Sequence, residues 1–316
     1  MSLALGLDVG GTKILACVSD AEGRVVARCR LDTPARAGAG AVLDALVAGA
    51  REAMGGLSVE DHRALVAVGV SAAGQIDVDN GVVAYASPNI SGWTGTPVGP
   101  HLQAALGVPV FVENDANAAA FGEWACGAGR GAPSIVAITV GTGVGGGLIL
   151  NHSIWRGRHW RGAEIGHMVL FGDGVRCNCG QTGCLEAYVS GTAIARLARE
   201  TRPGFSGDAR AVFAAAERGD VAMQEVLAFS ARCLAQGLVS LSSLVDVDLY
   251  LLGGGVATRP GYLDLVRRAL KDPQVSGERG FAPELLQEAA LGEEAGVIGA
   301  AQIALRSAGV AAVRSR

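Results

Sequence analysis

Residues 3–13 read LALGLDVGGTK, and this stretch decides the fold. The apolar run Leu3–Val9 predicts a buried strand, residues 10–13 predict a turn, and Ile14–Ser19 predicts a second strand. A further turn leads into Val25–Leu31, which completes an antiparallel meander. Beyond it, helical spacing of apolar residues alternates with short apolar runs, which is the pattern of an α/β fold.

The same order of elements returns in the second half of the chain. Ser134–Val140 predicts a strand, residues 141–147 (GTGVGGG) predict a glycine turn, and Leu148–Leu150 predicts a return strand. We therefore expect two similar α/β halves with a ligand cleft between them. The expected domain limits are residues 1–118, completed by a C-terminal helix at 297–316, and residues 119–296.

Composition excludes several classes of protein. Half of the 316 residues are hydrophobic and 18% are charged, which excludes a disordered chain. A net charge of −4 argues against nucleic-acid binding by bulk electrostatics. The two longest uncharged stretches are interrupted by polar residues and glycines, so no membrane span is predicted. Seven unevenly placed cysteines do not make a disulfide framework, and we expect a cytoplasmic protein.

Two glycine turns are suited to binding phosphate. At residues 8–13 the carboxylate of Asp8 precedes two glycines, whose backbone N–H groups can approach an anion, and it could hold Mg²⁺ through water. Residues 141–147 match G-x-G-x-x-G, but a strand follows instead of a helix, which excludes a dinucleotide fold. The alternatives are an ordinary hairpin for the first turn and a flexible loop for the second.

Residues 113–117 (ENDAN) follow a predicted buried strand and precede a helix. An aspartate here could accept the proton of a substrate hydroxyl, as the base does in phosphoryl transfer. The alternative is a helix cap, which would account for one of these polar residues.

Residues 177–184 (CNCGQTGC) place three thiols within eight residues. Thiolates at this spacing can converge on one tetrahedral Zn²⁺, with His167 as the best candidate for the fourth ligand. Four protein ligands would make the site structural, and free buried thiols are the alternative. Glu164 and Glu186 flank this loop and could accept hydrogen bonds from a polyol, although solvent-facing acids would look the same.

Two further loops give weaker signals. Residues 87–93 (SPNISGW) could contact a sugar through Asn89 or could be a rigid surface turn. The glycines at 253–255 could pass close beneath an adenine or a ribose.

Taken together, these motifs resemble the ROK family of sugar kinases and sugar-responsive repressors, and the likeness covers nearly the whole chain. The resemblance implies a two-domain actin-like (ribonuclease-H-like) ATPase fold, with ATP, Mg²⁺ and a structural Zn²⁺. It also implies phosphorylation of a monosaccharide at its 6-hydroxyl and a homodimer or higher homo-oligomer. The likeness is greatest to members that phosphorylate glucose. Kinases for N-acetylglucosamine, N-acetylmannosamine or fructose, and a non-catalytic sugar sensor, are the alternatives.

The resemblance assigns roles to particular residues. Asp115 is the implied catalytic base. The implied sugar contacts are Gly74, Asn89, Asn114, Glu164, His167 and Glu186. The implied zinc ligands are His167, Cys177, Cys179 and Cys184. The nucleotide is expected at Asp8, Gly10, Gly11, Thr12, Lys13, Gly141, Thr142, Gly143, Gly254 and Gly255. Repressor members carry a helix-turn-helix before the first glycine turn, and we expect none here because that turn begins within ten residues of the start.

Overall fold

The computed structural model describes residues 2–278 and 280–310, which form two compact units. Unit 1 contains the residues up to Gly131, the segment Ile154–Gly162 and the residues from Glu293 onward. Unit 2 contains Ala132–Ser153 and Ala163–Gly292. This division after Gly131 differs from the expected limit at residue 118. The expected domain limits stay a prediction. Residues 311–316 of the expected last helix lie outside the described residues.

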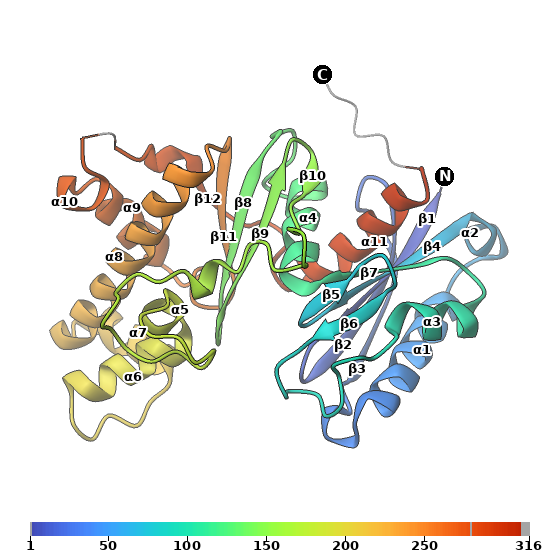
Figure 1. The fold of residues 1–316 in the computed structure, drawn as a ribbon, viewed down its shortest axis with the longest axis horizontal. Coiled ribbons are helices and arrows are strands. Elements are labelled where there is room, and N and C mark those ends of the chain that lie inside the picture. Colours follow the sequence, from blue (N-terminus) through green and yellow to red (C-terminus); the bar gives the residue numbers. More distant parts are fainter. Residues whose placement is uncertain (1, 279, 311–316) are drawn as a thin grey trace. The chain divides into compact units, whose positions relative to one another are not determined.

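Unit 1 is built on a mixed sheet of order β3-β2-β1-β4-β7, drawn from blue to green in Figure 1. The meander pairs antiparallel, whereas β4 and β7 run parallel to β1. The strands are β1 (Leu3–Val9), β2 (Lys13–Asp20), β3 (Val25–Asp32), β4 (Leu65–Ala72) and β7 (Val110–Asn114). A separate hairpin consists of β5 (Gln75–Asp77) and β6 (Val82–Tyr85).

Helices cover both faces of this sheet. The helix α1 (Ala39–Gly55) packs on the meander next to α3 (Val98–Leu106), and α2 (Val59–Ala64) leads into β4. The last helix, α11 (Ala295–Ser307), packs on β1 and β4 and against α4 (Asp115–Cys126). Glycine makes this packing close, because a Cβ on Gly6, Gly69 or Gly299 would overlap backbone oxygens of the facing segment.

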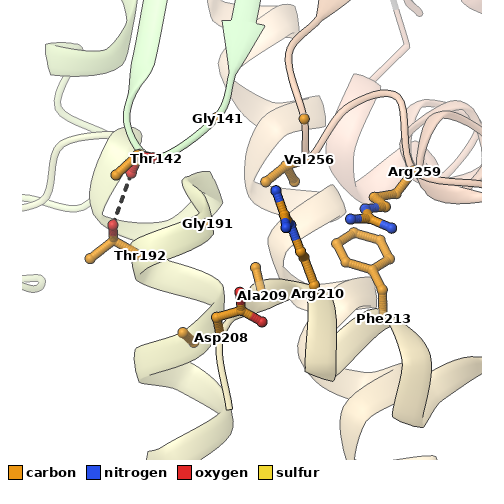
Figure 2. A pocket seen from close by; sticks show the side chains of 12 residues that line it. Gly141, Thr142, Gly191, Thr192, Asp208, Ala209, Arg210, Phe213, Val256 and Arg259 are labelled. Atoms are coloured by element: carbon orange, nitrogen blue, oxygen red, sulfur yellow. Dashed lines mark hydrogen bonds between the residues drawn. The ribbon is translucent and has the colours of Figure 1, made fainter. Parts of the chain in front are cut away.

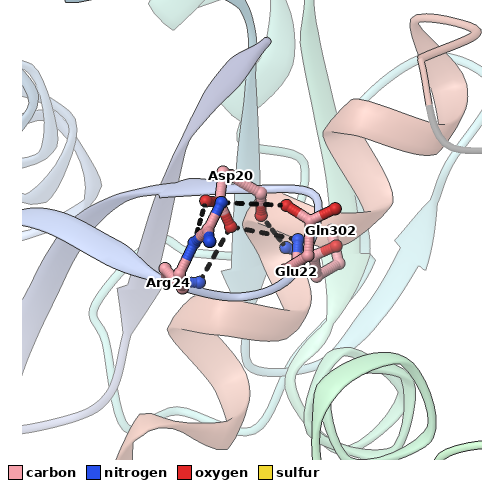
Figure 3. Close-up of polar contacts among 4 residues, drawn as sticks. All are labelled: Asp20, Glu22, Arg24 and Gln302. Carbon is pink, nitrogen blue, oxygen red and sulfur yellow. Dashed lines mark hydrogen bonds and ion pairs between the residues drawn. The ribbon is translucent and has the colours of Figure 1, made fainter. Parts of the chain in front are cut away.

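The turn between β2 and β3 attaches to α11 through polar contacts (Figure 3). The buried carboxylate of Asp20 accepts hydrogen bonds from the backbone N–H groups of Glu22 and Arg24 and from Arg24 Nε at 2.7 Å. Burial alone would raise the pKa of Asp20, but these hydrogen bonds outweigh it and lower that pKa. The Gln302 amide donates to the backbone oxygen of Asp20 at 2.7 Å, so the hairpin and the last helix hold each other.

Unit 2 repeats the same plan. Its sheet has the order β10-β9-β8-β11-β12, which is the same strand order as in unit 1 when the strands of each unit are counted along the chain. The strands are β8 (Ile135–Val140), β9 (Val144–Leu150), β10 (Ser153–Ile154), β11 (Leu249–Gly253) and β12 (Leu286–Glu288). An antiparallel hairpin is again followed by parallel partners, so the two halves share one topology, as the repeated order of elements indicates.

The helices of unit 2 gather beside its sheet in Figure 1. They are α5 (Glu186–Val189), α6 (Gly191–Thr201), α7 (Ala209–Glu217), α8 (Val221–Leu244), α9 (Tyr262–Leu270) and α10 (Pro273–Ser276). Among the described helices, α8 alone is long and apolar enough to cross a membrane. It packs against α6, α7 and α9, and its inner face joins the hydrophobic core, so we interpret it as the central helix of this unit.

One expected element differs from the structure. The glycine turn predicted over residues 141–147 is shorter, because β9 already begins at Val144. Gly146 lies inside the strand, where a Cβ would come within 2.5 Å of Ile165 Cδ1 and 2.7 Å of the Ala163 oxygen. The glycine lets Ala163 and Ile165 pack closely on the strand and does not turn the chain.

Candidate active site

The corner between β7 and α4 brings three of the expected site residues together. Asn114 is the N-cap of α4, and its Oδ1 accepts a hydrogen bond from Asn117 N. Its Nδ2 donates to the Gly74 oxygen at 2.9 Å and to Asp115 Oδ1 at 3.0 Å. Asp115 Oδ1 also accepts from Ala116 N, and the side chain is exposed. The cap explains Asn114, so Asp115 is a solvent-facing carboxylate with one oxygen held in place.

Asn89 lies in the loop after β6. It is exposed, and its Nδ2 donates to Ser87 Oγ at 3.2 Å. Within residues 2–278 and 280–310, no hydrogen bond joins Asn89 to Asn114.

The first glycine turn is held by its carbonyl groups. Thr33 donates its hydroxyl to the Gly10 oxygen at 2.8 Å and its backbone N–H to the Thr12 oxygen at 3.0 Å. Lys13 Nζ forms an ion pair with the exposed Glu293 at 2.5 Å. Because the carbonyl oxygens of Gly10 and Thr12 are directed to Thr33, the exposed edge at Gly11 and Thr12 is open to an anion.

Asp8 lies one residue before the end of β1. Its Oδ1 accepts from Ser71 Oγ on the neighbouring strand β4 at 2.5 Å. Burial raises the pKa of Asp8, against the opposing effects of the Ser71 hydrogen bond and the charge of Lys13. A half-buried carboxylate beside a hydroxyl offers oxygen ligands that suit Mg²⁺.

The second glycine turn, Gly141–Gly143, is held by α5 and α6. Gly191 N donates to the Gly141 oxygen at 2.7 Å, and Thr192 Oγ1 donates to the Thr142 oxygen at 2.9 Å. Val144 N donates to Glu186 Oε2 at 2.8 Å. A Cβ on Gly143 would lie 2.7 Å from that carboxylate oxygen, so a side chain at this position would displace the Glu186 carboxylate.

A cavity of about 460 Å³ opens beside this turn within unit 2 (Figure 2). Gly141, Thr142 and Gly255 line it, whereas Gly143 and Gly254 do not. Gly254 instead supports the backbone, since its φ is +90° and a Cβ would lie 2.6 Å from the Val140 oxygen. The other polar or aromatic side chains at the cavity are those of Thr192, Asp208, Arg210, Phe213 and Arg259.

Figure 2 shows the charged side chains of this cavity from close by. Arg210 rises from the first turn of α7 toward Val256, and Arg259 enters from the loop after β11 near Phe213. An open cavity with two guanidinium groups and an aromatic ring suits a flat, electron-rich ligand that also carries negative charge.

The four expected zinc ligands come together in unit 2. Their ligand atoms all lie within 4.8 Å of one another. Cys179 Sγ is 3.6 Å from Cys184 Sγ, and Cys177 Sγ is 3.8 Å from His167 Nδ1. Thiolates bound 2.3 Å from one tetrahedral Zn²⁺ would be about 3.8 Å apart. The residues present therefore fit zinc.

The pKa values of these thiols are shifted in different directions. Burial alone would raise the pKa of Cys179, but hydrogen bonds from Gln181 and from the neighbouring thiols outweigh it and lower that pKa. Burial and the neighbouring Cys179 and Cys177 raise the pKa of Cys184 to about 12. A thiol in this position loses its proton readily only when a cation stabilises the thiolate.

The two acids beside the metal cluster differ in their surroundings. Glu164 precedes the short 3-10 helix Ile165–His167 and is exposed. Glu186 contacts Cys177 Sγ through Oε1 at 3.7 Å, while its Oε2 accepts from Val144. Glu186 therefore links the metal cluster to the second glycine turn.

Comparison with known proteins identifies the family. The model of the ROK family matches residues 4–307. A glucokinase from Streptomyces coelicolor is 35% identical and is aligned over 96% of this chain and 98% of its own length. The chain belongs to the ROK family.

Solved ROK structures resemble the whole molecule. A ROK hexokinase from Thermus thermophilus has a TM-score of 0.84 at 36% identity, covering 98% of this chain and all of that one. A ROK glucokinase from Streptomyces griseus, solved with glucose and AMPPNP, has a TM-score of 0.81 at 35% identity, covering 96% of this chain and all of that one. The expected actin-like ATPase fold of ROK sugar kinases is confirmed.

Several residues that line the cavity beside Thr142 were not predicted from the sequence. Asp208, Arg210 and Arg259 belong to no expected motif, because they meet only in the folded unit. One signal was available: Arg210 lies in the first turn of a helix, where the macrodipole disfavours a cation. Glu113 belongs to the motif at residues 113–117 but has no expected role of its own, although it is a buried charge.

Proposed function

We propose that this ROK chain is an ATP-dependent glucokinase, which converts glucose and ATP into glucose 6-phosphate and ADP. The observation that carries the proposal is the exposed Asp115 carboxylate at the start of α4, oriented by Asn114 Nδ2 and Ala116 N. Glucokinases about one third identical over nearly the whole chain support the choice of sugar and donor.

Asp115 is the proposed general base. It accepts the proton of the 6-hydroxyl while that oxygen attacks the γ-phosphorus, and the bond from the γ-phosphorus to the ADP oxygen breaks. Positioning and charge stabilisation supply most of the acceleration in such transfers. The proposed sugar contacts are Gly74, Asn89 and Asn114 in unit 1, and Glu164, His167 and Glu186 in unit 2.

The nucleotide is proposed to bind through both glycine turns. The cavity beside Thr142 has the size of a small-molecule site and would take the adenosine, with Arg210 or Arg259 against the base. Backbone N–H groups at Gly11–Lys13 and at Thr142 and Gly143 would hold phosphates, whereas Gly10 and Gly141 shape the turns, because their N–H groups donate to the Lys13 and Gly143 oxygens. Asp8 would hold Mg²⁺, which neutralises phosphate charge when bound.

Zinc is proposed as a structural ion at His167, Cys177, Cys179 and Cys184. With four protein ligands it leaves no position for substrate, so it would act by holding the segment that carries Glu164 and Glu186. We also propose a dimer in solution, as the resemblance implies. Light scattering should give twice the chain mass of 32.0 kDa.

A coupled assay of ADP release over about a dozen monosaccharides tests the proposed substrate. Glucose should give the highest kcat/KM, and N-acetylmannosamine, N-acetylglucosamine and fructose should give lower values. Polyphosphate in place of ATP should support less transfer, because it cannot fill the adenosine cavity. Faster turnover of an N-acetylated sugar would reassign the substrate, and no sugar-dependent ADP release would favour a sugar sensor.

A further inference from the structure

Glu113 is a charged residue in the interior of unit 1. Its side chain is 2% exposed, and it lies just before Asn114 at the end of β7. Its Oε1 accepts from Asn114 N at 3.0 Å and from Asn117 Nδ2 at 3.1 Å. Its Oε2 accepts from Arg156 Nε at 2.6 Å. A buried carboxylate requires such partners, because burial removes its hydration.

Asn117 supplies one of the hydrogen-bond donors that the Glu113 carboxylate needs. This buried amide directs Nδ2 to Glu113, and its Oδ1 is left without a hydrogen bond in the described part of the chain. Polar groups are thus arranged around the Glu113 charge even at the expense of a neighbouring acceptor.

Arg156 comes from a distant part of the sequence, residues 154–162 (IWRGRHWRG), which we call the strap. The strap belongs to unit 1, although the segments before and after it belong to unit 2. It closes on itself, since Gly162 N donates to the Arg156 oxygen at 2.8 Å. A second contact to unit 1 joins Arg161 Nε to Gln75 Oε1 at 3.1 Å.

The backbone around the strap is constrained. Trp160 and Ala163 have φ values of 55° and 66°, which are uncommon for residues with a side chain. Such conformations persist only where the surroundings determine them. The strap is therefore a defined segment that can hold Arg156 against Glu113.

A chain of hydrogen bonds runs from Arg156 to the proposed base. Arg156 binds Glu113, Glu113 accepts from the backbone of Asn114, and Asn114 Nδ2 donates to Asp115 Oδ1. We propose that Arg156 is a positioning residue, which fixes the corner carrying Asn114 and Asp115 by pairing with the buried Glu113. This inference rests on the proposed sugar-kinase function, and it adds a residue that no expected motif contains.

The strap supplies its own control. Arg156 and Arg161 lie five residues apart in one segment, and both contact unit 1 through Nε. Arg156 meets a buried charge, whereas Arg161 is exposed and meets a neutral amide. Arg156→Met and Arg161→Met therefore remove the same charge from the same segment, and only the first leaves Glu113 without its cation.

The test measures steady-state kinetics for glucose and ATP with the full chain. Arg156→Met should lower kcat about 10- to 100-fold and raise KM for glucose, because a displaced base and acceptor no longer align. KM for ATP should be unchanged, because the adenosine cavity and its turn lie in unit 2. Arg156→Lys should recover much of kcat, and Arg161→Met should behave as the unchanged protein does.

A second variant separates positioning from stability. In Glu113→Gln/Arg156→Met no buried charge is left unpaired, so this protein should unfold close to the unchanged protein's Tm. The inference requires the kcat of this double variant to stay low, since residue 156 no longer binds residue 113. Full kcat in this double variant, or equal losses for Arg156→Met and Arg161→Met, would overturn the inference.

The unchanged protein in the same assay tests the proposed function separately. If it releases ADP with glucose, the kinase assignment stands whatever the variants do. If it binds glucose and releases no ADP, the kinase assignment fails. Arg156 is then judged by glucose affinity in calorimetry, where Arg156→Met should bind more weakly than Arg161→Met, and equal affinities would overturn the inference.

Discussion

The two units share one sheet topology and differ in what they place at the strand ends. In both, a three-residue turn follows the central strand, at Gly10–Thr12 and at Gly141–Gly143. Just before these turns, β1 presents Asp8 where β8 presents Thr139. The comparison teaches that the backbone plan provides an anion-accessible turn twice, whereas only the turn of unit 1 has a carboxylate at this position of the preceding strand.

The turns also differ in how they are supported. In unit 1 the support comes from β3 and its following residue, through Thr33. In unit 2 it comes from α5 and α6, which follow the metal cluster directly in the chain. Loss of the metal cluster should therefore displace the turn at Gly141–Gly143 and leave the turn at Gly10–Thr12 unchanged.

The largest expected effect is at Asp115. Asp115→Asn should lower kcat by about 10²- to 10⁴-fold, because the amide cannot accept the hydroxyl proton. The measurement is ADP release at saturating glucose and ATP, with glucose affinity followed by calorimetry. The matched control is Glu288→Gln. Glu288 is an exposed acid at the end of β12, which is the strand of unit 2 that corresponds to β7 of unit 1. Equal losses in both variants would remove Asp115 from the mechanism.

The metal cluster should give the next largest effect. Cys179→Ser, or removal of zinc by a chelator, should raise KM for both ATP and glucose about 10- to 100-fold, because Glu186 supports the second turn and is a proposed sugar contact. Bound metal should be measured alongside the kinetics. Cys126→Ser in unit 1 is the control, since Cys126 lies outside the cluster. Zinc loss with an unchanged KM for ATP would show that the cluster does not support the turn.

A smaller effect is expected on the pH dependence of stability. The pKa of Asp8 is raised by burial above its ordinary value of 3.8, so the folded chain holds this proton more tightly than the unfolded chain. The contribution of Asp8 to stability is then fully present below about pH 3.8 and is lost as pH rises through the folded pKa. Asp8→Asn should therefore raise Tm at pH 8 more than at pH 4, while KM for Mg–ATP increases.

The control for Asp8 is its counterpart in the other sheet. Thr139→Val changes a side chain at the same strand position without removing a charge, and its effect on Tm should not vary with pH. An Asp8→Asn effect on Tm that is equal at both pH values would contradict the assigned cause.

The smallest effect is expected at Arg210. Arg210→Ala should raise KM for ATP about two- to fivefold by removing a cation from the face of the base. Arg202→Ala, which breaks an exposed pair with Asp220 outside the cavity, should leave KM for ATP as it was. A large loss of kcat with an unchanged KM for ATP would place Arg210 elsewhere in the reaction.

Much of the fold could be predicted because it depends on patterns among residues that are close together in the sequence. Alternating elements and two glycine turns specified both sheets, and the spacing of the cysteines specified a cluster within one loop. The strand at Val144 was missed because glycines serve close packing there as well as turns. Arg156 and Glu113 are 43 residues apart, and no local pattern joins them.

The place of α11 has a consequence for synthesis. Most of unit 1 precedes unit 2 in the chain, yet the face of its sheet that packs on α11 is covered only when residues after 292 arrive. At roughly 5–20 residues per second, the 161 residues from Ala132 to Gly292 take roughly 8 to 32 s to translate. During that interval the glycine-lined face of β1 and β4 lacks its helix on the ribosome. Unit 2 can finish folding first, and the nascent amino-terminal half is the part that chaperones would have reason to protect.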